Sequence, residues 1–559
     1  MKSNFTAYSL TISGMLVLLS RFATAAPMPD AGSTLRDIEK KINAETPIFI
    51  PNSPPENLQA TPPKNYNNEL RFLVTAFQIE GNTRFADAEL LALLKPMTGS
   101  EHSLSEIEDA IMNISRYYWK NNYPLAYAYI PPQDIKNGVI KVAVVEGRYG
   151  AINIINKSNT KDSVINRFFA VEKEEYPIIN SQRLEHLLNI LKEMTDTSEI
   201  SSALSKGEEA KSSNLSININ SAPAVTGNLE ANNYGSSFTG KNHIEGGLNW
   251  SNPLGLGDRL NTKVLSSGEG QDFFLLGYTI PVGAHGWRLG AAYSDSSYQL
   301  GGEFANLNAH GKASRLTLSA NYPITRLQNR NLNLDINFNQ KKLNDIIGTT
   351  ALLDSNKTQY SGSVALNGQF SLHPAHQSIF NTALEAGTLH TTVSQNASVS
   401  TNEESFSKLS YALTNSYLFS PATTLSLAIN GQKAFKNLDS SEKISLGGIY
   451  GVRAYKPGAG SGDKGFIANL ELRYRTRAPF DYGQTSWMLF VDAGHVRINI
   501  DPAPATINTQ NLVGIGTGLQ WQLPYKTSLQ ILYAMRARHN EPGESNPRSR
   551  AWLQLTKNF

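Results

Sequence analysis

The sequence predicts a mixed fold, in which two small α/β domains precede a 16-stranded antiparallel transmembrane β-barrel. Two patterns lead to this prediction. Between residues 69 and 222, apolar residues recur at helix and strand spacing in two successive units. From about Val225 onward, apolar and polar residues alternate in segments of roughly ten residues, the length of a tilted membrane-spanning strand.

The strand number follows from the length of the C-terminal part. About 336 residues, at roughly 21 for each strand and its connection, give roughly 16 strands. The alternation is clearest around Ile336, where the apolar positions are Leu332, Leu334, Ile336 and Phe338. An apolar face suits lipid, and a polar face suits a water-filled or plugged lumen. The chain ends on Phe559 after alternating Leu553 and Leu555.

Composition excludes several classes of protein. The 559 residues include 50 Lys+Arg and 47 Asp+Glu, so the net charge of +3 gives no broad basic field for nucleic acid. No apolar run reaches the roughly 18 residues of a membrane-spanning helix. The absence of Cys removes disulfides, thiolate metal sites and Cys nucleophiles. We expect no enzymatic activity, no cofactor and no metal site.

The N-terminus has the pattern of an export signal. Residues 1–26 contain Lys2, an apolar centre from Met15 to Leu19 and small residues from Ala23 to Ala26. This order is typical of a signal peptide with a small-residue cleavage site. The sequence therefore predicts that the chain is exported across the inner membrane.

A short amphipathic helix and a linker are predicted next. Within residues 27–44, one helical stripe contains Leu35, Ile38 and Ile42, and charged residues occupy the other faces. Six prolines then fall within residues 45–68, which favours an extended linker over a helix or an inner strand.

Two α/β units follow, at residues 69–148 and 149–222. The first is predicted to run strand, helix, helix, strand, strand, with helices over 86–94 and 104–119 and strands over 126–130 and 139–145. The second repeats this order more faintly. A repeated unit of about 75 residues indicates tandem domains.

Several segments of these units resemble a known domain. They are IEGNTRF from Ile79 to Phe85, YPLAYAYIPPQ from Tyr123 to Gln133, and VEG from Val145 to Gly147. In this order they resemble a POTRA domain of the two-partner secretion outer-membrane transporters, the TpsB class that includes ShlB, FhaC and HecB. The resemblance implies that residues 69–148 and 149–222 are POTRA domains 1 and 2, and that residues 223–559 form the barrel.

Two motifs in the barrel part extend the resemblance. Val452, Arg453, Ala454 and Tyr455 resemble the Val-Arg-Gly-Tyr/Phe loop of this superfamily, with Ala454 where Gly is usual. Phe490, Asp492 and Gly494 match its partner motif on a later strand. The resemblance implies that a loop at residues 434–464 folds into the lumen. If strand alternation turns Asp492 inward, the Arg453 guanidinium can reach its carboxylate with two hydrogen bonds.

The resemblance also implies a function and partners. A TpsB-type transporter would secrete an unfolded TpsA-type exoprotein, an adhesin, haemolysin or haem-scavenging protein, from the periplasm to the cell surface. The helix with Leu35, Ile38 and Ile42 would plug the lumen, and Phe559 would be the signal for the barrel assembly machinery. We expect a monomer in outer-membrane lipid, with the POTRA domains in the periplasm and no nucleic-acid partner.

Two other functions remain open at this point. A barrel-assembly factor of the BamA or TamA kind shares the loop motif, but such proteins have more POTRA repeats and lack the helix and the Pro-rich linker. A porin or ligand-uptake channel would have no need of POTRA-like domains. The identity of the exported protein is not encoded in any of these motifs.

Overall fold

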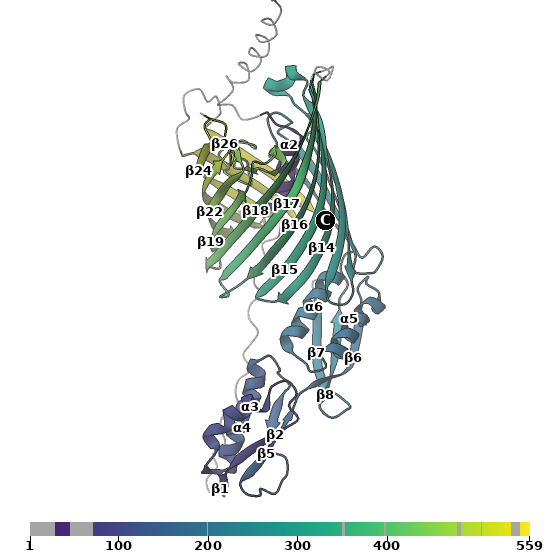
Figure 1. Ribbon diagram of the computed structural model, residues 1–559, viewed down its shortest axis with the longest axis vertical. Helices are drawn as coiled ribbons and strands as arrows, with labels where there is room; N and C mark the ends of the chain where they lie inside the picture. Colours follow the sequence, from purple (N-terminus) through teal and green to yellow (C-terminus); the bar gives the residue numbers. More distant parts are fainter. Residues whose placement is uncertain are drawn as a thin grey trace, which may run out of the picture.

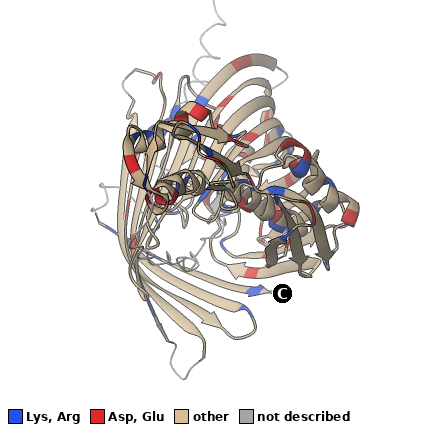
Figure 2. Ribbon diagram, turned by 90° about the horizontal axis from the view of Figure 1, so that it is seen from below, with Lys and Arg blue, Asp and Glu red and all other residues tan. Residues whose placement is uncertain are grey.

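The computed structural model describes residues 28–44, 71–197, 199–348, 353–395, 398–477, 482–504, 506–537 and 548–559. The signal peptide predicted at 1–26 and the linker predicted at 45–68 lie outside the described residues. Two α/β units lie below a β-barrel, and helix α2 (Ala31–Ala44) lies within it (Figure 1). Seen from below, the α/β units lie across part of the barrel end (Figure 2).

Sixteen antiparallel strands close into one barrel, which confirms the predicted fold class. Neighbours in sequence are neighbours in the sheet, and β19 pairs with β22 across a long connection. The strands are β9 (Val225–Asn232), β10 (His243–Ser251), β11 (Arg259–Ser266), β12 (Gln271–Val282), β13 (Trp287–Gln299), β14 (His310–Leu327), β15 (Arg330–Ile347), β16 (Leu353–Phe370), β17 (His376–Gln395), β18 (Ser398–Ser420), β19 (Thr423–Ala434), β22 (Lys464–Arg477), β23 (Gln484–Arg497), β24 (Thr509–Leu523), β25 (Thr527–Arg536) and β26 (Ser549–Asn558).

The alternating sequence places apolar side chains on the outer wall and polar side chains inside. On β15, Ile336 and Phe338 are 43% and 52% exposed, whereas Asn339 and Lys341 are only 3% and 4% exposed. Lipid offers no hydrogen-bond partners, so each backbone group in the membrane must pair within the sheet. Closure of the barrel meets this requirement.

The first and last strands close the barrel. Strand β26 pairs with β9 from Gln554 opposite Asn232 to Asn558 opposite Asn228. The terminal Phe559 continues this pairing: its N–H donates to the Gly227 carbonyl at 3.0 Å, and the Gly227 N–H donates back at 3.2 Å. The C-terminal aromatic residue is therefore fixed at the barrel seam.

The first α/β unit packs two helices on a three-stranded sheet in the order β2-β5-β4. Its elements are β1 (Arg71–Val74), β2 (Ala76–Glu80), α3 (Asp87–Leu94), η1 (Lys95–Met97), β3 (Ser100–Ser103), α4 (Leu104–Lys120), β4 (Tyr127–Tyr129) and β5 (Val139–Val145). Helix α4 begins with a capping box between Ser103 and Glu106 and buries Ile107, Ile111 and Ile114 on one face. The sequence missed the pair β1–β3, because such short strands leave no clear period.

The second α/β unit has the strand, helix, helix, strand, strand order without counterparts of β1, η1 and β3, and its sheet has the order β6-β8-β7. Its elements are β6 (Arg148–Asn156), α5 (Asp162–Glu175), α6 (Ser181–Thr195), β7 (Ile200–Lys206) and β8 (Ser212–Ile219). Ile165, Leu191 and Leu215 are fully buried in its core. None of the helices in the described part of the chain is long and apolar enough to cross a membrane.

Hydrogen bonds join the three parts of the chain. The Ser181 N–H donates to the Asn122 carbonyl at 2.9 Å, between the two α/β units. Helix α6 contacts the end of β14: the Asn189 side chain donates to the Arg326 carbonyl at 3.0 Å, and Glu193 pairs with the Arg326 guanidinium at 2.6 Å. The second unit is thereby attached directly to the lower rim of the barrel.

Candidate functional site in the barrel lumen

The connection between β19 and β22 turns back into the barrel. The antiparallel pair β20 (Ile444–Ser445) and β21 (Ser461–Gly462) closes its base. Val452 and Ala454 at its tip are 0% exposed, and they pack with Phe490 and Trp552 of the barrel wall. Residues 435–463 therefore fill part of the lumen.

The tip of this loop is fixed by Arg453 and Asp492. Arg453 donates from Nε to Oδ2 of Asp492 at 2.9 Å and from Nη2 to Oδ1 at 2.8 Å. The Arg453 backbone N–H adds a third bond to Oδ2, at 3.0 Å. Asp492 is 0% exposed and Arg453 is 7% exposed, so little solvent screens the pair. Only a planar guanidinium can make this forked contact.

The pair is part of a larger network. Arg453 Nη1 contacts Glu471 at 2.9 Å, and Glu471 also accepts from Arg473 at 2.7 Å. Asn469 donates to Asp492 Oδ1 at 2.7 Å. The Trp552 indole N–H donates to the Arg453 carbonyl at 2.8 Å. Three strands of the wall, β22, β23 and β26, therefore contribute to the position of the loop, and the expected contact between Arg453 and Asp492 lies at the centre of the network.

The aromatic residues of both motifs contact guanidinium groups. Arg453 lies over the Phe490 ring, 3.5 Å from its centroid, and Arg536 lies 4.4 Å from the centroid of the Tyr455 ring. Such cation–π contacts are strongest where the groups are shielded from water. Phe490 is 3% exposed and Tyr455 is 8% exposed.

Glycines on the wall make room for the loop. A Cβ on Gly494 would lie 3.1 Å from Leu446 and from Val452, and a Cβ on Gly514 would lie 2.7 Å from the Cβ of Ala454. Ala454 is not among the described residues with positive φ. An alanine therefore fits at this position without a left-handed backbone.

Helix α2 occupies the lumen beside the loop. Leu35 and Ile38 are 1% and 6% exposed and pack against inward side chains of the barrel, and Ile42 adds a partly buried contact. The inward side chains are Phe238, Leu265, Phe273, Tyr298, Leu300, Ala309, Ala313 and Leu343. The predicted apolar stripe of α2 thus packs against apolar side chains inside the barrel. The sequence alone did not indicate this apolar region of the inner wall.

The polar face of α2 is held by ions and carbonyl groups. Arg36 donates to the Ser440 carbonyl at 2.8 Å, and Lys40 donates to the Ser445 carbonyl at 2.9 Å, both in the loop. Glu39 pairs with Arg315 at 2.6 Å, and Lys41 pairs with Glu230 at 2.7 Å, both on the wall. The helix is therefore bound to both the loop and the barrel.

A buried carboxylate of the loop was missed by the sequence analysis. Glu442, in η3 (Ser440–Glu442), is 3% exposed and accepts from Lys341 at 2.6 Å and from Gln359 at 2.8 Å. It also accepts a short bond from Lys408. Alternation predicts that β15, β16 and β18 carry inward polar residues. It does not predict that three of these residues contact the same loop residue, Glu442.

These groups are arranged to hold structure in place. Within the described residues, no cluster of three or more His, Cys, Asp or Glu side chains could bind a metal ion. Several ion pairs of the lumen join elements distant in sequence: Glu39 with Arg315, Lys341 with Glu442, and Arg453 with Asp492. Separating α2 or the loop from the wall would therefore break ion pairs.

A second candidate site is the open edge of β7 in the second α/β unit. The Gly207 N–H, just after β7, donates to the Ser212 carbonyl of β8 at 3.0 Å. Because backbone groups alternate in direction along a strand, the odd-numbered residues of β7 hydrogen-bond to β8. The N–H and C=O groups of Ile200, Ser202 and Leu204 therefore point away from β8, toward the open edge. In the described part of the chain, no hydrogen bond is made to them there.

A groove of about 430 Å³ lies beside this edge. Leu184 and Leu188 of α6 form one side, and Ile200 and Leu204 of β7 form the other. An extended peptide in this groove could pair with the free backbone groups and bury alternate side chains.

The corresponding edge of the first α/β unit is closed. The Ala128 N–H on β4 donates to the Ser115 hydroxyl at 2.9 Å, and the Ala126 carbonyl accepts from the Trp119 indole at 2.8 Å. Both side chains come from α4. Side chains of the unit itself therefore satisfy two of the backbone groups that a bound strand would use.

The first unit contains one buried carboxylate, Glu146. It accepts from the N–H groups of Thr83 and Arg84, both at 2.9 Å, and from the Tyr118 hydroxyl at 2.7 Å. Burial acts to raise the pKa of Glu146, but hydrogen bonds from Thr83, Tyr118 and Arg84 outweigh it and hold the pKa below its usual value. The VEG motif thus fixes the turn of the IEGNTRF motif.

Two family models match the chain. The model described as haemolysin secretion/activation protein ShlB/FhaC/HecB matches residues 211–521, more than half of the chain. The model described as POTRA domain, ShlB-type, matches residues 72–147.

Known proteins match over most or all of the chain. It is 27% identical over 566 residues to the heme/hemopexin transporter protein HuxB of Haemophilus influenzae (strain 86-028NP), covering 99% of both proteins. It is 22% identical over 461 residues to the outer membrane transporter CdiB of Dickeya dadantii (strain 3937), covering 80% of this chain and 81% of that protein. The structure of CdiB from Escherichia coli has the same fold, with a TM-score of 0.76 at 18% identity over 96% of this chain and 100% of that chain.

Proposed function

Because the chain belongs to the haemolysin secretion/activation family ShlB/FhaC/HecB, we propose that it binds its unfolded partner exoprotein along β7 and exports it when α2 leaves the lumen. As a member of this family, the protein is a two-partner secretion transporter of the outer membrane. Its POTRA domains are periplasmic, and it acts with a TpsA-type exoprotein. The rim opposite the POTRA domains therefore faces the cell surface.

The difference between the two sheet edges supports binding of the exoprotein to POTRA domain 2. Ser115 and Trp119 bond to the β4 edge of POTRA domain 1, whereas the β7 edge has no hydrogen-bond partner among the described residues and lies beside a groove with apolar and polar lining. Main-chain pairing accepts an unfolded chain of almost any sequence, and Leu184 and Leu188 add selectivity for apolar side chains. POTRA domain 1 would then orient the incoming chain.

Release of α2 is supported by the kind of contacts that hold it. Its stripe buries Leu35 and Ile38, but its other faces depend on ion pairs such as Glu39 with Arg315. Cargo side chains and water can replace such polar contacts one at a time. Residues 45–68, if extended at about 3.1 Å per residue, would reach on the order of 75 Å. That length is enough for the helix to leave the barrel while it stays attached.

The contact between Arg453 and Asp492 would fix the in-folded loop during export. The loop binds α2 through the carbonyl groups of Ser440 and Ser445. Its position therefore also determines where α2 binds. Losing the contact at the tip should disturb both elements.

The cargo we propose is an exoprotein that takes part in haem or hemopexin transport. The likeness to HuxB extends over the full length of both proteins, whereas the CdiB of D. dadantii covers a smaller share of this chain at lower identity. We further propose that the protein works as a monomer without enzymatic activity, and that the barrel assembly machinery recognises Phe559 at the seam.

The test is co-expression with the exoprotein encoded beside this gene, followed by assay of the medium. Export by the wild-type protein and loss of export without it are expected. Ser202→Pro removes an N–H from the open edge without removing a bond to β8, and should reduce export. Ser202→Ala is the matched control, because it keeps the backbone N–H, and should export normally. Equal export by both variants would contradict capture at β7.

A further inference from the structure

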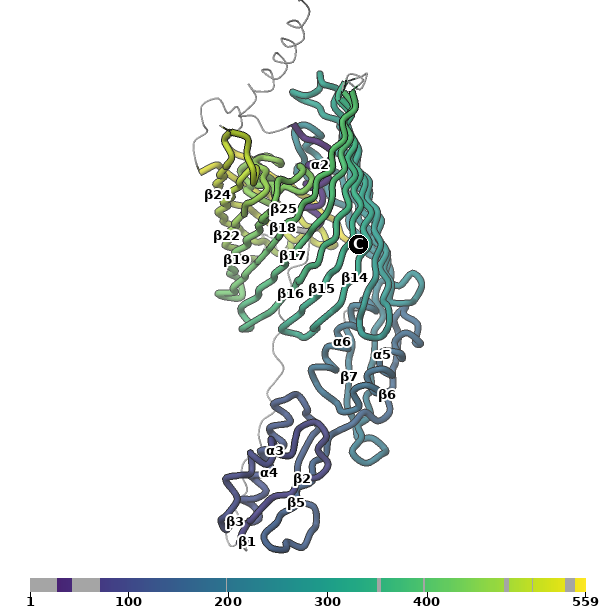
Figure 3. The backbone as a smooth tube through the Cα atoms, in the orientation of Figure 1, coloured from purple at the N-terminus to yellow at the C-terminus, as the bar shows by residue number. Residues whose placement is uncertain are grey.

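The barrel wall is much taller on one side. Strands β14, β15 and β16 have 18 residues each, β17 has 20 and β18 has 23, whereas the other barrel strands have 8 to 15. In Figures 1 and 3 these long strands rise above the rest of the rim, on the side away from the POTRA domains. This extension therefore stands outside the membrane at the cell surface.

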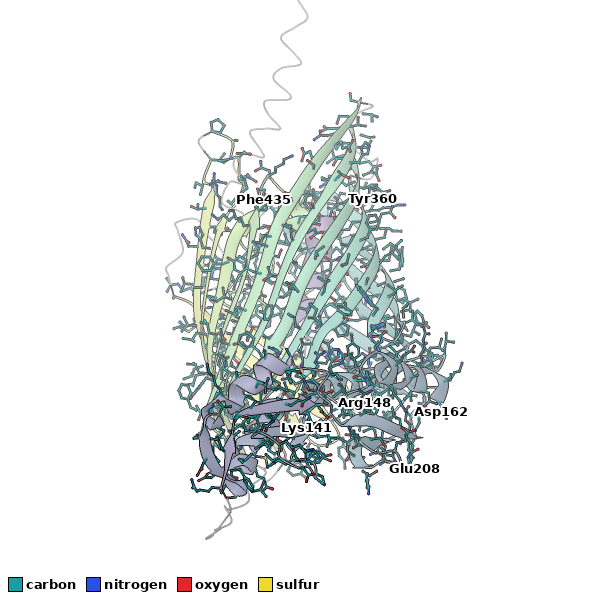
Figure 4. The ribbon with its side chains drawn as sticks, turned by 60° about the horizontal axis from the view of Figure 1, so that its bottom comes forward. Lys141, Arg148, Asp162, Glu208, Tyr360 and Phe435 are labelled. Atoms are coloured by element: carbon teal, nitrogen blue, oxygen red, sulfur yellow. The ribbon has the colours of Figure 1, made fainter. Side chains whose placement is uncertain are left out.

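At one edge of the extension, the upper part of β18 has no paired strand on its β19 side. Strand β19 pairs with β18 only as far as Ala434 opposite Lys408, and the Phe435 N–H then donates to the Ser407 carbonyl at 3.0 Å. Phe435 lies near the upper end of the barrel (Figure 4). Beyond it the chain turns into the lumen loop, while β18 continues upward to Ser398, paired with β17 alone.

The backbone groups of this edge are free. Because Ser407 bonds toward β19, the N–H and C=O groups of Val399, Thr401, Glu403 and Ser405 point to the same side. Residues 398–405 are all exposed. Within the described residues, no hydrogen bond is made to these backbone groups from that side. Eight residues at about 3.4 Å each give a free edge of roughly 27 Å.

Most of the features that usually protect a sheet edge are missing here. Natural edges are blocked by Lys and other charged residues, Pro, bulges or a covering segment. Residues 398–405 include no Lys, Pro or Gly, and their charged residues are Glu403 and Glu404. The irregularity of β18 lies at its other end, between Leu418 and Ser420, and Lys436 contacts the edge at its lower end, where it donates to the Ser405 hydroxyl at 2.8 Å. The opposite side of the tall wall is covered, since β13 pairs with β14 up to Gln299 opposite His310. The free edge therefore lies on the side where the loop enters the lumen.

We propose that this edge of β18 binds the exported chain by strand addition as it leaves the lumen. The inference rests on the proposed function. An emerging chain is extended, and its own N–H and C=O groups lack partners. The free edge lies beside the loop at the lumen mouth, where a chain that leaves the lumen would meet it. Pairing there would hold the first exported segment outside and oppose its return.

Site-specific cross-linking tests this inference, because the native chain contains no Cys. Glu403→Cys is combined with partner exoproteins that carry single cysteines at successive positions and a folded C-terminal domain that stalls export. Strand pairing predicts disulfides at every second partner position, since alternate residues of a strand share one face. Ile507→Cys is the control, because Ile507 is 79% exposed between β23 and β24 on the same rim. The Ile507→Cys variant should give no disulfide pattern that repeats at every second partner position.

The possible outcomes separate the inference from the proposed function. Cross-links without a two-residue period, or equal cross-linking at both positions, would overturn the inference while export continued. Disulfide-linked pairs of transporters would instead show that the edge joins two copies of this chain. Absence of export by the wild-type protein would contradict the proposed function itself.

A proline variant supplies a second measurement. Thr401→Pro with Glu403→Pro removes two N–H groups from the free edge but none from the ladder with β17. With Val399→Cys as the cross-linking position, this variant should lose the periodic disulfides, and Thr401→Ala with Glu403→Ala should keep them. Heat-modifiable migration checks that both barrels are folded. Persistence of the period in the proline variant would overturn the inference.

Discussion

Ala454 and Gly514 lie in direct contact, and the space for the Ala454 methyl group exists because Gly514 has no side chain. A Cβ on Gly514 would lie 2.7 Å from the Cβ of Ala454, while its next nearest contacts would be 3.4 Å and 3.5 Å away. The loop and strand β24 thus fit together closely at this pair of positions. The fit of Ala454 therefore depends on the glycine of the strand.

The first prediction concerns this contact. Gly514→Ala should displace the loop tip and reduce export, with an overpacking cost of about 1 to 3 kcal/mol. Adding Ala454→Gly should restore export, because it removes the one atom in conflict. Secretion of the partner exoprotein is the measurement, and Ala454→Gly alone is the control, expected near wild type. Failure of the second substitution to restore export would show that another contact limits the site.

The second prediction concerns Arg453 and Asp492. Arg453→Ala and Asp492→Ala should each cut secretion strongly, because each leaves the other charge buried without its partner, at a cost of about 3 kcal/mol. Arg453→Lys should also fail, since an ammonium cannot make the fork. The double substitution should be no worse than either alone.

Arg473→Ala provides the control for this cycle. It removes a contact to Glu471 from a side chain that is 34% exposed, and leaves Asp492 paired. We expect a small loss of secretion. Losses that add up in the double variant would mean that Arg453 and Asp492 act separately.

The third prediction concerns α2. Deleting residues 28–44 should raise single-channel conductance in planar bilayers and spare secretion, because the helix fills space between the wall and the loop. Leu35→Asp with Ile38→Asp should have a similar, smaller effect by placing charges against the apolar wall. Lys173→Ala, on helix α5 outside the barrel, is the matched control. An unchanged conductance after the deletion would place the helix outside the conducting path.

The fourth prediction concerns pH and POTRA domain 1. The pKa of Glu146 is lower in the folded state than in the unfolded chain. Its stabilising effect is therefore present above the unfolded value, about 4.3, and is lost as the pH falls through the folded value. Glu146→Gln should weaken hydrogen-exchange protection of residues 71–145 at pH 7, and the difference from wild type should become smaller as the pH falls below the unfolded value. Glu108→Gln, at an exposed position of α4, should change neither.

Local patterns determined much of this protein. Alternation alone gave lipid-facing residues such as Ile336 and Phe338 and the inward direction of Asp492, because the side-chain period of a strand is a property of a few consecutive residues. The strand number followed from the same repeat over the C-terminal part. Helical spacing likewise gave the buried faces of α4 and α2. Alternation alone does not predict the contact between Arg453 and Asp492. That prediction also required the resemblance of both segments to the family motifs.

Only the tertiary structure decided which elements meet. Nothing in the sequence pairs Glu442 with Lys341 and Lys408, because each ion pair joins residues far apart in the chain. The same holds for the two sheet edges: Ser115 of the same unit bonds to β4, whereas the outer edge of β7 has no hydrogen-bond partner in the part of the chain that the structure describes. The open edge of β18 exists because β19 ends at Ala434 and its chain turns inward. Strand periodicity is local, but the presence or absence of a neighbouring strand depends on long-range pairing, which a local pattern does not encode.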